Sequence, residues 1–301
     1  MSLQAAIKRL SLIIDKVSRS HYPTKKEILE YVNDTGIKLS ERTLDRDFEK
    51  LRDEFGVELK YDPAKNGYSI LEEESPRFNT FLRLIELNET ADLISTTLKE
   101  GKENLKYIDF ETSSAFRGIQ HLKDLYQAIR NHHYISFDHT NYHSGVTKAF
   151  FNIEPYLLKE YQNRWYLVGR IKGADHFITF GIDRMSRLQI MNKQFTPKDD
   201  IEVRELFSDI VGIVYSISEV EEVLMAVDEK QAKYFKSLPW HESQKIFTEN
   251  GKTFMRMHVR PNFELTQKIM MQGDLIEVLK PEWLREKIAQ LHHNAAKKYN
   301  Q

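Results

Sequence analysis

The segment from residue 40 to residue 71 restricts the fold of this chain more than any other part of the sequence. Ser40 is a good helix N-cap, because its side chain can accept a hydrogen bond from an N–H group of the first turn. Apolar residues follow at spacings of four, three and four, which places them on one side of a helix: Leu44, Phe48, Leu51 and Phe55. Gly56 is a typical C-terminal stop. The segment 40–55 is therefore predicted to be an amphipathic helix.

A β-hairpin is predicted directly after this helix. Apolar residues alternate with polar ones on both sides of Asn66-Gly67, a dipeptide typical of tight turns between strands: Val57, Leu59, Tyr61, Tyr68 and Ile70. Upstream, Thr24 and Glu27 have the spacing of a capping box, and a still earlier helix carries Ile7, Leu10, Ile14 and Val17. Three short helices and a hairpin indicate a winged helix-turn-helix, a module whose recognition helix enters the DNA major groove.

The predicted contacts to double-stranded DNA come from the third helix and the hairpin. The N-terminal residues of a recognition helix reach base edges, and hairpin lysines can contact phosphate. The expected DNA-binding residues are Ser40, Arg42, Thr43, Arg46, Lys50, Lys60 and Lys65. Residues 1–71 carry 13 Lys+Arg and 12 Asp+Glu, so binding would depend on a few placed arginines and not on a broad basic field. An ordinary helical bundle with a hairpin, or a protein-binding module, fits the same pattern.

The whole chain has the composition of a globular protein of two or three domains. Its 301 residues are 41% hydrophobic and 30% charged, with a net charge of −1. No apolar run has the length of a membrane span, and the N-terminus does not read as a signal peptide. The sequence contains no cysteine, which excludes disulfides and Cys-ligated zinc. We therefore expect a cytoplasmic protein without membrane association.

The pattern along the chain predicts an α+β multidomain protein. The acidic break at residues 72–76 ends the winged helix-turn-helix domain, residues 1–74. Helical spacing then predicts a connector over 75–132, either a plain linker or a hinge and dimerisation element. Short alternating strands suggest a small β-barrel over 133–205, at 134–138, 147–153, 164–170 and 177–182. Strands mixed with helices predict a ferredoxin-like α+β C-terminal domain over 206–301.

Several motifs resemble one known family. Trp165-Tyr166-Leu167 is the tripeptide that names the WYL-domain family, and Asn152–Tyr156 resembles the family's strand that ends in a proline. Phe180–Met185 is similar to its F-x-L-D-R-I element, and Gly273–Arg285 to the end of its C-terminal extension domain. Residues 40–55 resemble its usual helix-turn-helix. The resemblance implies a bacterial transcription regulator, often a repressor and a homodimer, whose Sm/SH3-like β-barrel (the WYL domain) senses a nucleotide or nucleic acid.

The same resemblance points to a ligand site in the barrel. The candidate ligand-binding residues are Arg164, Tyr166, Arg170, Asp183 and Arg184. Alternation places Trp165 and Leu167 on the core side of their strand. Tyr166 and Arg170 then lie on the other side, where they either stack and pair with a base and a phosphate or belong to a solvated sheet face. Asp183 and Arg184 either contact the ligand or form an ion pair that closes the barrel.

Two positions depart from the family pattern. Phe137 stands where the family usually has a tyrosine, and Ile178 where it often has an arginine. Both changes remove polar groups from the expected pocket, which puts an anionic ligand in doubt or shifts its recognition to the remaining arginines.

Other classes of site find little support in the sequence. His139 and His143 have helical zinc-ligand spacing, but they lie in a predicted turn, where that spacing puts nothing on one face. Neither a Walker loop, a G-x-S-x-G nor a G-x-G-x-x-G motif is present. We therefore expect no metal, no cofactor and no enzymatic activity. The alternative to a DNA-binding regulator is an interaction module that binds RNA or single-stranded DNA and regulates a partner enzyme.

Overall fold

The computed structural model describes residues 3–71, 75, 77–100, 104, 118–197, 203–216 and 218–299. These residues form an α+β structure, which confirms the predicted class. The chain divides into two compact units, Met1–Glu111 (unit 1) and Thr112–Gln301 (unit 2). Residues 72–74 and 76 of the acidic break, and residues 101–103 and 105–117 of the predicted connector, lie outside the described residues. Within the described parts, no helix is both long and apolar enough to cross a lipid bilayer.

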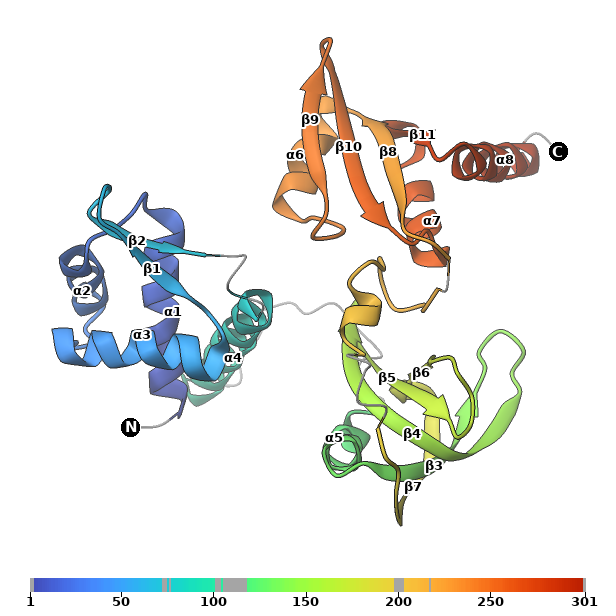
Figure 1. The fold of residues 1–301 in the computed structure, drawn as a ribbon, viewed down its shortest axis with the longest axis horizontal. Helices are drawn as coiled ribbons and strands as arrows, with labels where there is room; N and C mark the ends of the chain where they lie inside the picture. The colour runs from blue at the N-terminus through green and yellow to red at the C-terminus, as the bar shows by residue number, and fades with distance from the viewer. Residues whose placement is uncertain are drawn as a thin grey trace. The chain divides into compact units, whose positions relative to one another are not determined.

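Unit 1 contains the predicted three helices and hairpin, followed by a long helix (Figure 1). Its elements are α1 (Leu3–Arg19), α2 (Lys25–Asp34), α3 (Glu41–Phe55), β1 (Leu59–Asp62), β2 (Gly67–Ile70) and α4 (Phe78–Glu100). Thr24 and Glu27 form the predicted capping box of α2. Ser40 caps α3, and Gly56 ends it in the left-handed region with φ 62°. Local chemistry therefore decides where these helices begin and end.

The core of unit 1 joins all of its helices. Leu44 and Leu51 of α3 are fully buried against apolar residues of the other elements, among them Leu10, Ile13, Ile28, Val32 and Phe81. The hairpin closes over this core through Tyr68 and Ile70. Only the first turns of α4 take part, through Phe78, Phe81 and Ile85.

Unit 2 begins with a short helix that packs on an antiparallel sheet. The helix is α5 (Leu122–Arg130), and the strands are β3 (His133–Thr140), β4 (Thr147–Tyr161), β5 (Arg164–Ile171), β6 (Ile178–Gly181) and β7 (Met185–Gln194). Leu125 and Ala128 of α5, which falls in the predicted connector range, are buried in the core of this sheet. β4 is longer than predicted, and β7 was not predicted because most of its side chains are exposed and show no apolar alternation.

The expected barrel is not closed. The strand order is β6-β5-β4-β3-β7, and among the described residues no backbone pairing joins β6 to β7. A single 3₁₀ turn, Ile182–Arg184, links the two strands and turns the chain so that β7 pairs with β3 instead. β6 has four residues and pairs only with β5. The sheet is therefore open at these two edges.

The second part of unit 2 is a four-stranded antiparallel sheet covered by helices (Figure 1). Its elements are β8 (Glu221–Val227), α6 (Glu229–Ser237), β9 (Lys245–Glu249), β10 (Lys252–Val259), α7 (Phe263–Met270), β11 (Ile276–Lys280) and α8 (Glu282–Tyr299), with strand order β11-β8-β10-β9. These alternating strands and helices agree with the mixture of both that was predicted for residues 206–301. Alternating burial along β8 and β10 explains why the period-two pattern was readable.

Candidate functional site

The N-terminal half of α3 presents two arginines to solvent. Arg42 and Arg46 are exposed, and within the described residues neither forms an ion pair or a side-chain hydrogen bond. Ser40 lies beside them, and its hydroxyl is 2.9 Å from that of Thr43. Lys50, one turn further on, is 3.5 Å from the Glu54 carboxylate. The helix therefore offers cationic side chains mainly in its first two turns.

Asp45, which lies next to Arg46 on α3, forms an ion pair with Lys25. The Asp45 carboxylate is 2.5 Å from the Lys25 ammonium of α2, and this hydrogen bond raises the pKa of Lys25. The pair removes a negative charge that would otherwise oppose a polyanion at this surface. Arg46 and Lys50 also line a hollow of about 450 Å³ between α1 and α3, together with Asp53 and Glu54.

The orientation of α3 depends on a buried ion pair that the sequence analysis missed. Arg9 of α1 donates to both carboxylate oxygens of Asp47, at 2.5 and 2.7 Å, and both side chains are almost completely buried. Asp47 lies three residues after Leu44 and four before Leu51, on the apolar side of α3. A charged residue at that spacing was the available signal, because a buried carboxylate needs a partner.

The hairpin lysines differ in their surroundings. Lys60 is exposed on β1. The ammonium of Lys65 lies 3.7 Å from the centre of the Tyr22 ring and 3.9 Å from the Asp62 carboxylate. The hairpin is attached to the loop before α2, where the Tyr68 N–H donates to the Pro23 carbonyl. The tip is thus held on unit 1 and does not depend on the turn alone.

In unit 2, the structure gathers four of the five candidate ligand residues. The Asp183 carboxylate is 3.7 Å from the guanidinium of Arg164 and 3.7 Å from that of Arg184. Tyr166 is buried beside them, and burial raises the pKa of its hydroxyl while the two arginines oppose this. Two guanidinium groups therefore share one carboxylate. The Nε atom of Arg184 is buried and has no hydrogen-bond partner in the described part of the chain.

Arg170 lies apart from this group. It pairs with Glu154 at 2.6 Å, and both side chains are buried. The hydroxyls of Tyr134 and Tyr156 also donate to Glu154, at 3.3 and 3.4 Å. Arg170 is therefore already engaged inside the protein.

Of the two alternatives for Tyr166 and Arg170, the solvated sheet face is wrong, because both side chains are buried. Val168, between them, packs against the segment that follows β7, through Val203, Phe207 and Ile210. This later segment covers the second face of β5, so the strand is buried on both sides. Leu167 is fully buried on the other side, as predicted, and Trp165 packs against the same core.

The two departures from the family pattern are core residues. Phe137 is buried, with ring centres 5.0 and 5.6 Å from those of Phe180 and Phe150. Ile178 packs against the same cluster. The two positions where the family has a tyrosine and an arginine are therefore filled here by apolar side chains of the core.

The burial of one histidine in this region was not predicted from the sequence. His139 lies on β3, not in the turn, beside the rings of Phe137, Phe150 and Phe180. Its Nε2 atom is buried and has no partner within the described residues. Burial, and then the charge of Arg184, lower the pKa of His139. His143 lies in the following turn.

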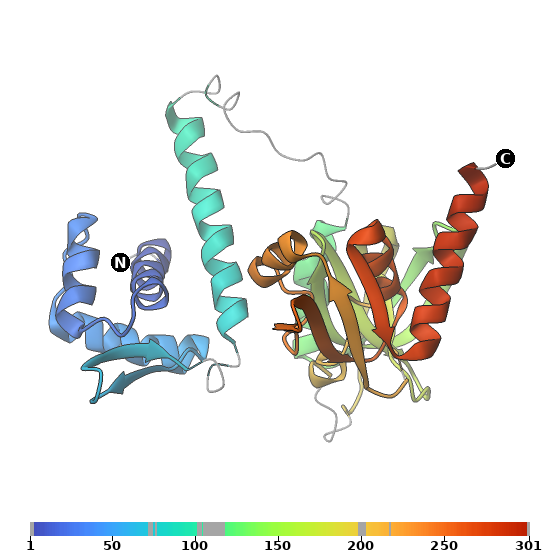
Figure 2. The ribbon, with the colours of Figure 1, turned by 90° about the horizontal axis from the view of Figure 1, so that it is seen from above.

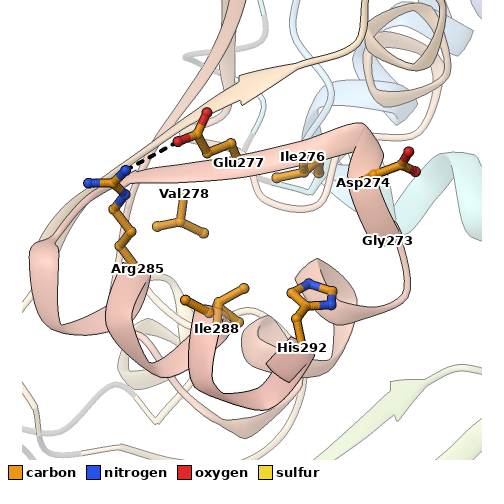
Figure 3. A pocket seen from close by; sticks show the side chains of 9 residues that line it. Gly273, Asp274, Ile276, Glu277, Val278, Arg285, Ile288 and His292 are labelled. Carbon is orange, nitrogen blue, oxygen red and sulfur yellow. Dashed lines mark hydrogen bonds and ion pairs between the residues drawn. The ribbon is translucent and has the colours of Figure 1, made fainter. Parts of the chain in front are cut away.

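A further hollow lies between β11 and α8 (Figure 3). Its volume is about 390 Å³, and Ile276, Val278 and Ile288 form an apolar floor. Arg285 and Glu277 form an ion pair of 3.4 Å at its rim. None of the predicted site residues lies there, and in the described part of the chain no group of three potential metal-ligating side chains exists here or elsewhere.

Comparison with family models identifies two domains in unit 2. Residues 120–190 match the WYL domain, and residues 219–296 match the WCX domain. The chain thus contains a WYL domain followed by a WCX domain. The motifs at 164–170 and 180–185 lie within the first match, and the motif at 273–285 lies within the second, so the resemblance seen in the sequence is confirmed.

Solved structures and curated proteins add less to this WYL-domain assignment. The chain is similar to the proteasome accessory factor B/C (PafBC) of Arthrobacter aurescens, with 18% identity and a TM-score of 0.31, over 95% of this chain and 46% of that one. It thus spans less than half of the PafBC chain. It is also similar to a CRISPR Cas-related protein, with 15% identity and a TM-score of 0.40, over 100% of this chain and 87% of that one. None of the curated proteins matches this chain.

Proposed function

We propose that this WYL-domain protein is a transcription regulator that binds double-stranded DNA through unit 1. In this proposal α1–α3 and the β1-β2 hairpin act as a winged helix-turn-helix, with α3 as the recognition helix. The observation that carries it is the pair of exposed, unpaired arginines, Arg42 and Arg46, in the first two turns of α3. Arginine can read guanine in the major groove through two hydrogen bonds. Ser40, Thr43, Lys50, Lys60 and Lys65 would position the unit on phosphates.

Unit 2 would then act as the sensor. We propose that the sheet β3–β7 is a partly open relative of the Sm/SH3-like barrel. We also propose that the β-α-β-β-α-β order from β8 to β11 is a ferredoxin-like domain. We take the guanidinium groups of Arg164 and Arg184, which share the Asp183 carboxylate beside Tyr166, as support for a nucleotide or nucleic-acid ligand. Arg170 would support this site only indirectly, because Glu154 engages it. The protein would act as a homodimeric repressor without enzymatic activity.

Binding to the protein's own promoter tests this function. Arg42→Ala and Arg46→Ala should each weaken specific duplex binding by about 1–3 kcal/mol, because each removes contacts to a base edge. Arg52→Ala is the matched control, since Arg52 is exposed on the last turn of α3 and pairs with Asp53 at 2.8 Å. Fluorescence anisotropy with promoter and scrambled duplexes measures the difference. Equal affinity of the native chain for both duplexes would exclude a sequence-specific regulator.

The same assay separates the alternative function. An interaction module for RNA or single-stranded DNA would prefer single strands and would lose affinity on substitution of Arg164 or Arg184, not of Arg42 or Arg46. The regulator should instead prefer duplex and lose affinity on the α3 substitutions alone.

A further inference from the structure

Two buried nitrogen atoms at one end of the β3–β7 sheet have no hydrogen-bond partner among the described residues. They are Nε2 of His139, on β3, and Nε of Arg184, in the 3₁₀ turn before β7. Buried polar atoms of folded proteins are nearly always hydrogen-bonded, either to protein or to a bound molecule. Two such atoms in one place therefore point to a group that binds both.

Strand pairing and one glycine bring these two atoms together. His139 pairs with Met185, the residue after Arg184, where β3 meets β7. The His139 ring forms a hydrogen bond with the backbone of Gly181. The Arg184 guanidinium also lies against Gly181, because a Cβ atom added there would be 2.6 Å from Nε. Both groups contact the same glycine, so the two unpartnered atoms lie close to one another.

The two atoms have opposite hydrogen-bonding roles. Burial, and then the charge of Arg184, lower the pKa of His139, whereas the bond to Gly181 raises it. A bond that raises the pKa is donated by the ring, so the Gly181 carbonyl accepts it. The donor is Nδ1, because Nε2 has no partner. In the neutral ring, which burial favours, Nε2 is then an acceptor, while Nε of Arg184 is always a donor.

A hydroxyl group has the chemistry that satisfies both atoms. Its oxygen accepts a hydrogen bond from Arg184 and donates its own proton to His139. Carbonyl oxygens and ionised phosphate oxygens accept but do not donate, so they would leave Nε2 of His139 unpaired. The pair therefore selects a hydroxyl over the other oxygen groups of a nucleotide.

The surroundings of the pair suit the other parts of a nucleotide. The strands β3 and β4, drawn in green in Figures 1 and 2, are joined by an exposed turn, residues 141–146. Tyr142 in this turn is 55% exposed, and its ring centre lies 5.4 Å from the Arg184 guanidinium. An exposed aromatic ring can stack on a base. Lys148, opposite His139 on β4, is exposed and has no ion pair within the described residues, so it can contact a phosphate.

We infer that His139 and Arg184 bind the 2′-hydroxyl of a ribonucleotide, so that unit 2 distinguishes RNA from DNA. The inference rests on the proposed function, in which unit 2 senses a nucleotide or nucleic acid, and it adds the choice of sugar. The 2′-hydroxyl both donates and accepts, and it is the group by which a protein tells RNA from DNA. Because both nitrogens are buried, the turn that carries Tyr142 must shift to admit the sugar.

Binding of labelled single strands tests the choice of sugar. Short oligoadenylates with ribose, 2′-deoxyribose and 2′-O-methylribose are compared by fluorescence anisotropy. The full chain carries Arg42→Ala and Arg46→Ala, which suppress nucleic-acid binding by α3. The ribose strand should bind at least about tenfold more tightly than the other two, because each of those leaves a buried nitrogen unpaired. Equal affinity for adenosine monophosphate and the ribose strand indicates a free ribonucleotide, and a much weaker affinity indicates an RNA strand.

Two substitutions test the residues themselves. His139→Phe keeps an aromatic ring in the core but removes the acceptor, and Arg184→Lys keeps the charge but removes the Nε donor. Each should weaken binding of the ribose strand to the level of the deoxyribose strand, whose own affinity should not change. His133→Phe, at the other end of β3, is the matched control and should keep the preference. A melting curve by circular dichroism identifies a variant that fails to fold, and the comparison of the three strands with native His139 and Arg184 then decides.

The outcomes separate this inference from the proposed function. Equal affinity for the ribose and deoxyribose strands overturns the inference but leaves the proposed sensor standing, and it is the result expected if only a buried water molecule bridges the two atoms. A ribose preference that neither His139→Phe nor Arg184→Lys reduces overturns the assignment of these residues. If none of the probes binds, the inference and the proposed nucleotide sensor both fail, while the promoter assay still decides the role of unit 1.

Discussion

Among single residues, Arg9 and Asp47 have the largest predicted effect on unit 1. Their side chains are 6% and 3% exposed and form two short hydrogen bonds between α1 and α3. Such a pair adds little net stability over a well-packed apolar pair, but the loss of one partner leaves a buried charge. It connects α3, the proposed recognition helix, to α1, so a buried pair holds the helix that carries Arg42 and Arg46.

Asp47→Ala should therefore destabilise unit 1 by about 3–5 kcal/mol, since Arg9 would remain buried without a counter-charge. The three tryptophans, Trp165, Trp240 and Trp283, all lie in unit 2, so their fluorescence does not report on this unit. Hydrogen exchange of α1 and α3 peptides measures the effect directly. The double substitution Arg9→Met with Asp47→Leu should restore most of the protection. Unchanged exchange in Asp47→Ala would show that the pair is not buried in solution.

At the level of elements, the β1-β2 hairpin depends on one glycine. Gly67 begins β2, and a Cβ atom there would lie 1.8 Å from the Tyr22 carbonyl oxygen. The strand and the loop before α2 can approach this closely only without a side chain at this position. Asn66-Gly67 was predicted from turn chemistry, but this contact with Tyr22 is distant in sequence and left no local pattern.

Gly67→Ala should displace the hairpin and destabilise unit 1 by about 3 kcal/mol, because the clash is with backbone. Gly36→Ala provides the comparison: Gly36 has φ +85° but no atom within 4 Å of an added Cβ, so only about 1–2 kcal/mol is expected. Thermal unfolding followed by circular dichroism measures the stability of both variants. Promoter binding, measured below the unfolding transition, reports on the position of the hairpin. Equal losses in the two variants would contradict the close approach.

In the molecule as a whole, the segment 203–216 joins the two domains of unit 2. The hydroxyl of Thr179 on β6 donates to the Ile213 carbonyl at 2.9 Å. On the other side, Asn262 donates to the Val211 carbonyl, and the buried Glu264 accepts from the Val214 N–H at 3.2 Å. The segment is thus held by residues of both domains, so it can transmit a change in one of them to the other.

Glu264 gives this joint a pH dependence. Burial raises the pKa of its carboxyl above the ordinary 4.5, so the folded protein holds this proton more tightly than the unfolded chain. Stability should therefore fall as pH rises from about 4.5 through the folded pKa and then level off. Glu264→Gln should remove this component, because the amide keeps an acceptor oxygen and carries no charge. Urea unfolding followed by tryptophan fluorescence gives the free energy of unfolding of both proteins at each pH. The difference between the two values should change with pH. A difference that does not change with pH would refute the assignment.

Local patterns explain the parts of the fold that were predictable. Ser40, Gly56 and the Thr24–Glu27 capping box determine helix ends through contacts a few residues apart, and alternation along β8 and β10 reports burial of one face. β7 was missed because an edge strand with exposed side chains has no such alternation. The burial of Val168 on the second face of β5 was missed because Val203, Phe207 and Ile210, which pack against it, come after β7.

The sequence by itself determined the helix boundaries, the α+β class and the WYL motifs, because capping, periodicity and short motifs act over a few neighbouring residues. Only the tertiary structure decided which charges remain available. It leaves Arg42 and Arg46 exposed, engages Asp47 with Arg9 and Arg170 with Glu154, and gathers Arg164, Asp183 and Arg184 around Tyr166. The pairing of charges depends on which distant segments pack together, and no local pattern contains that information.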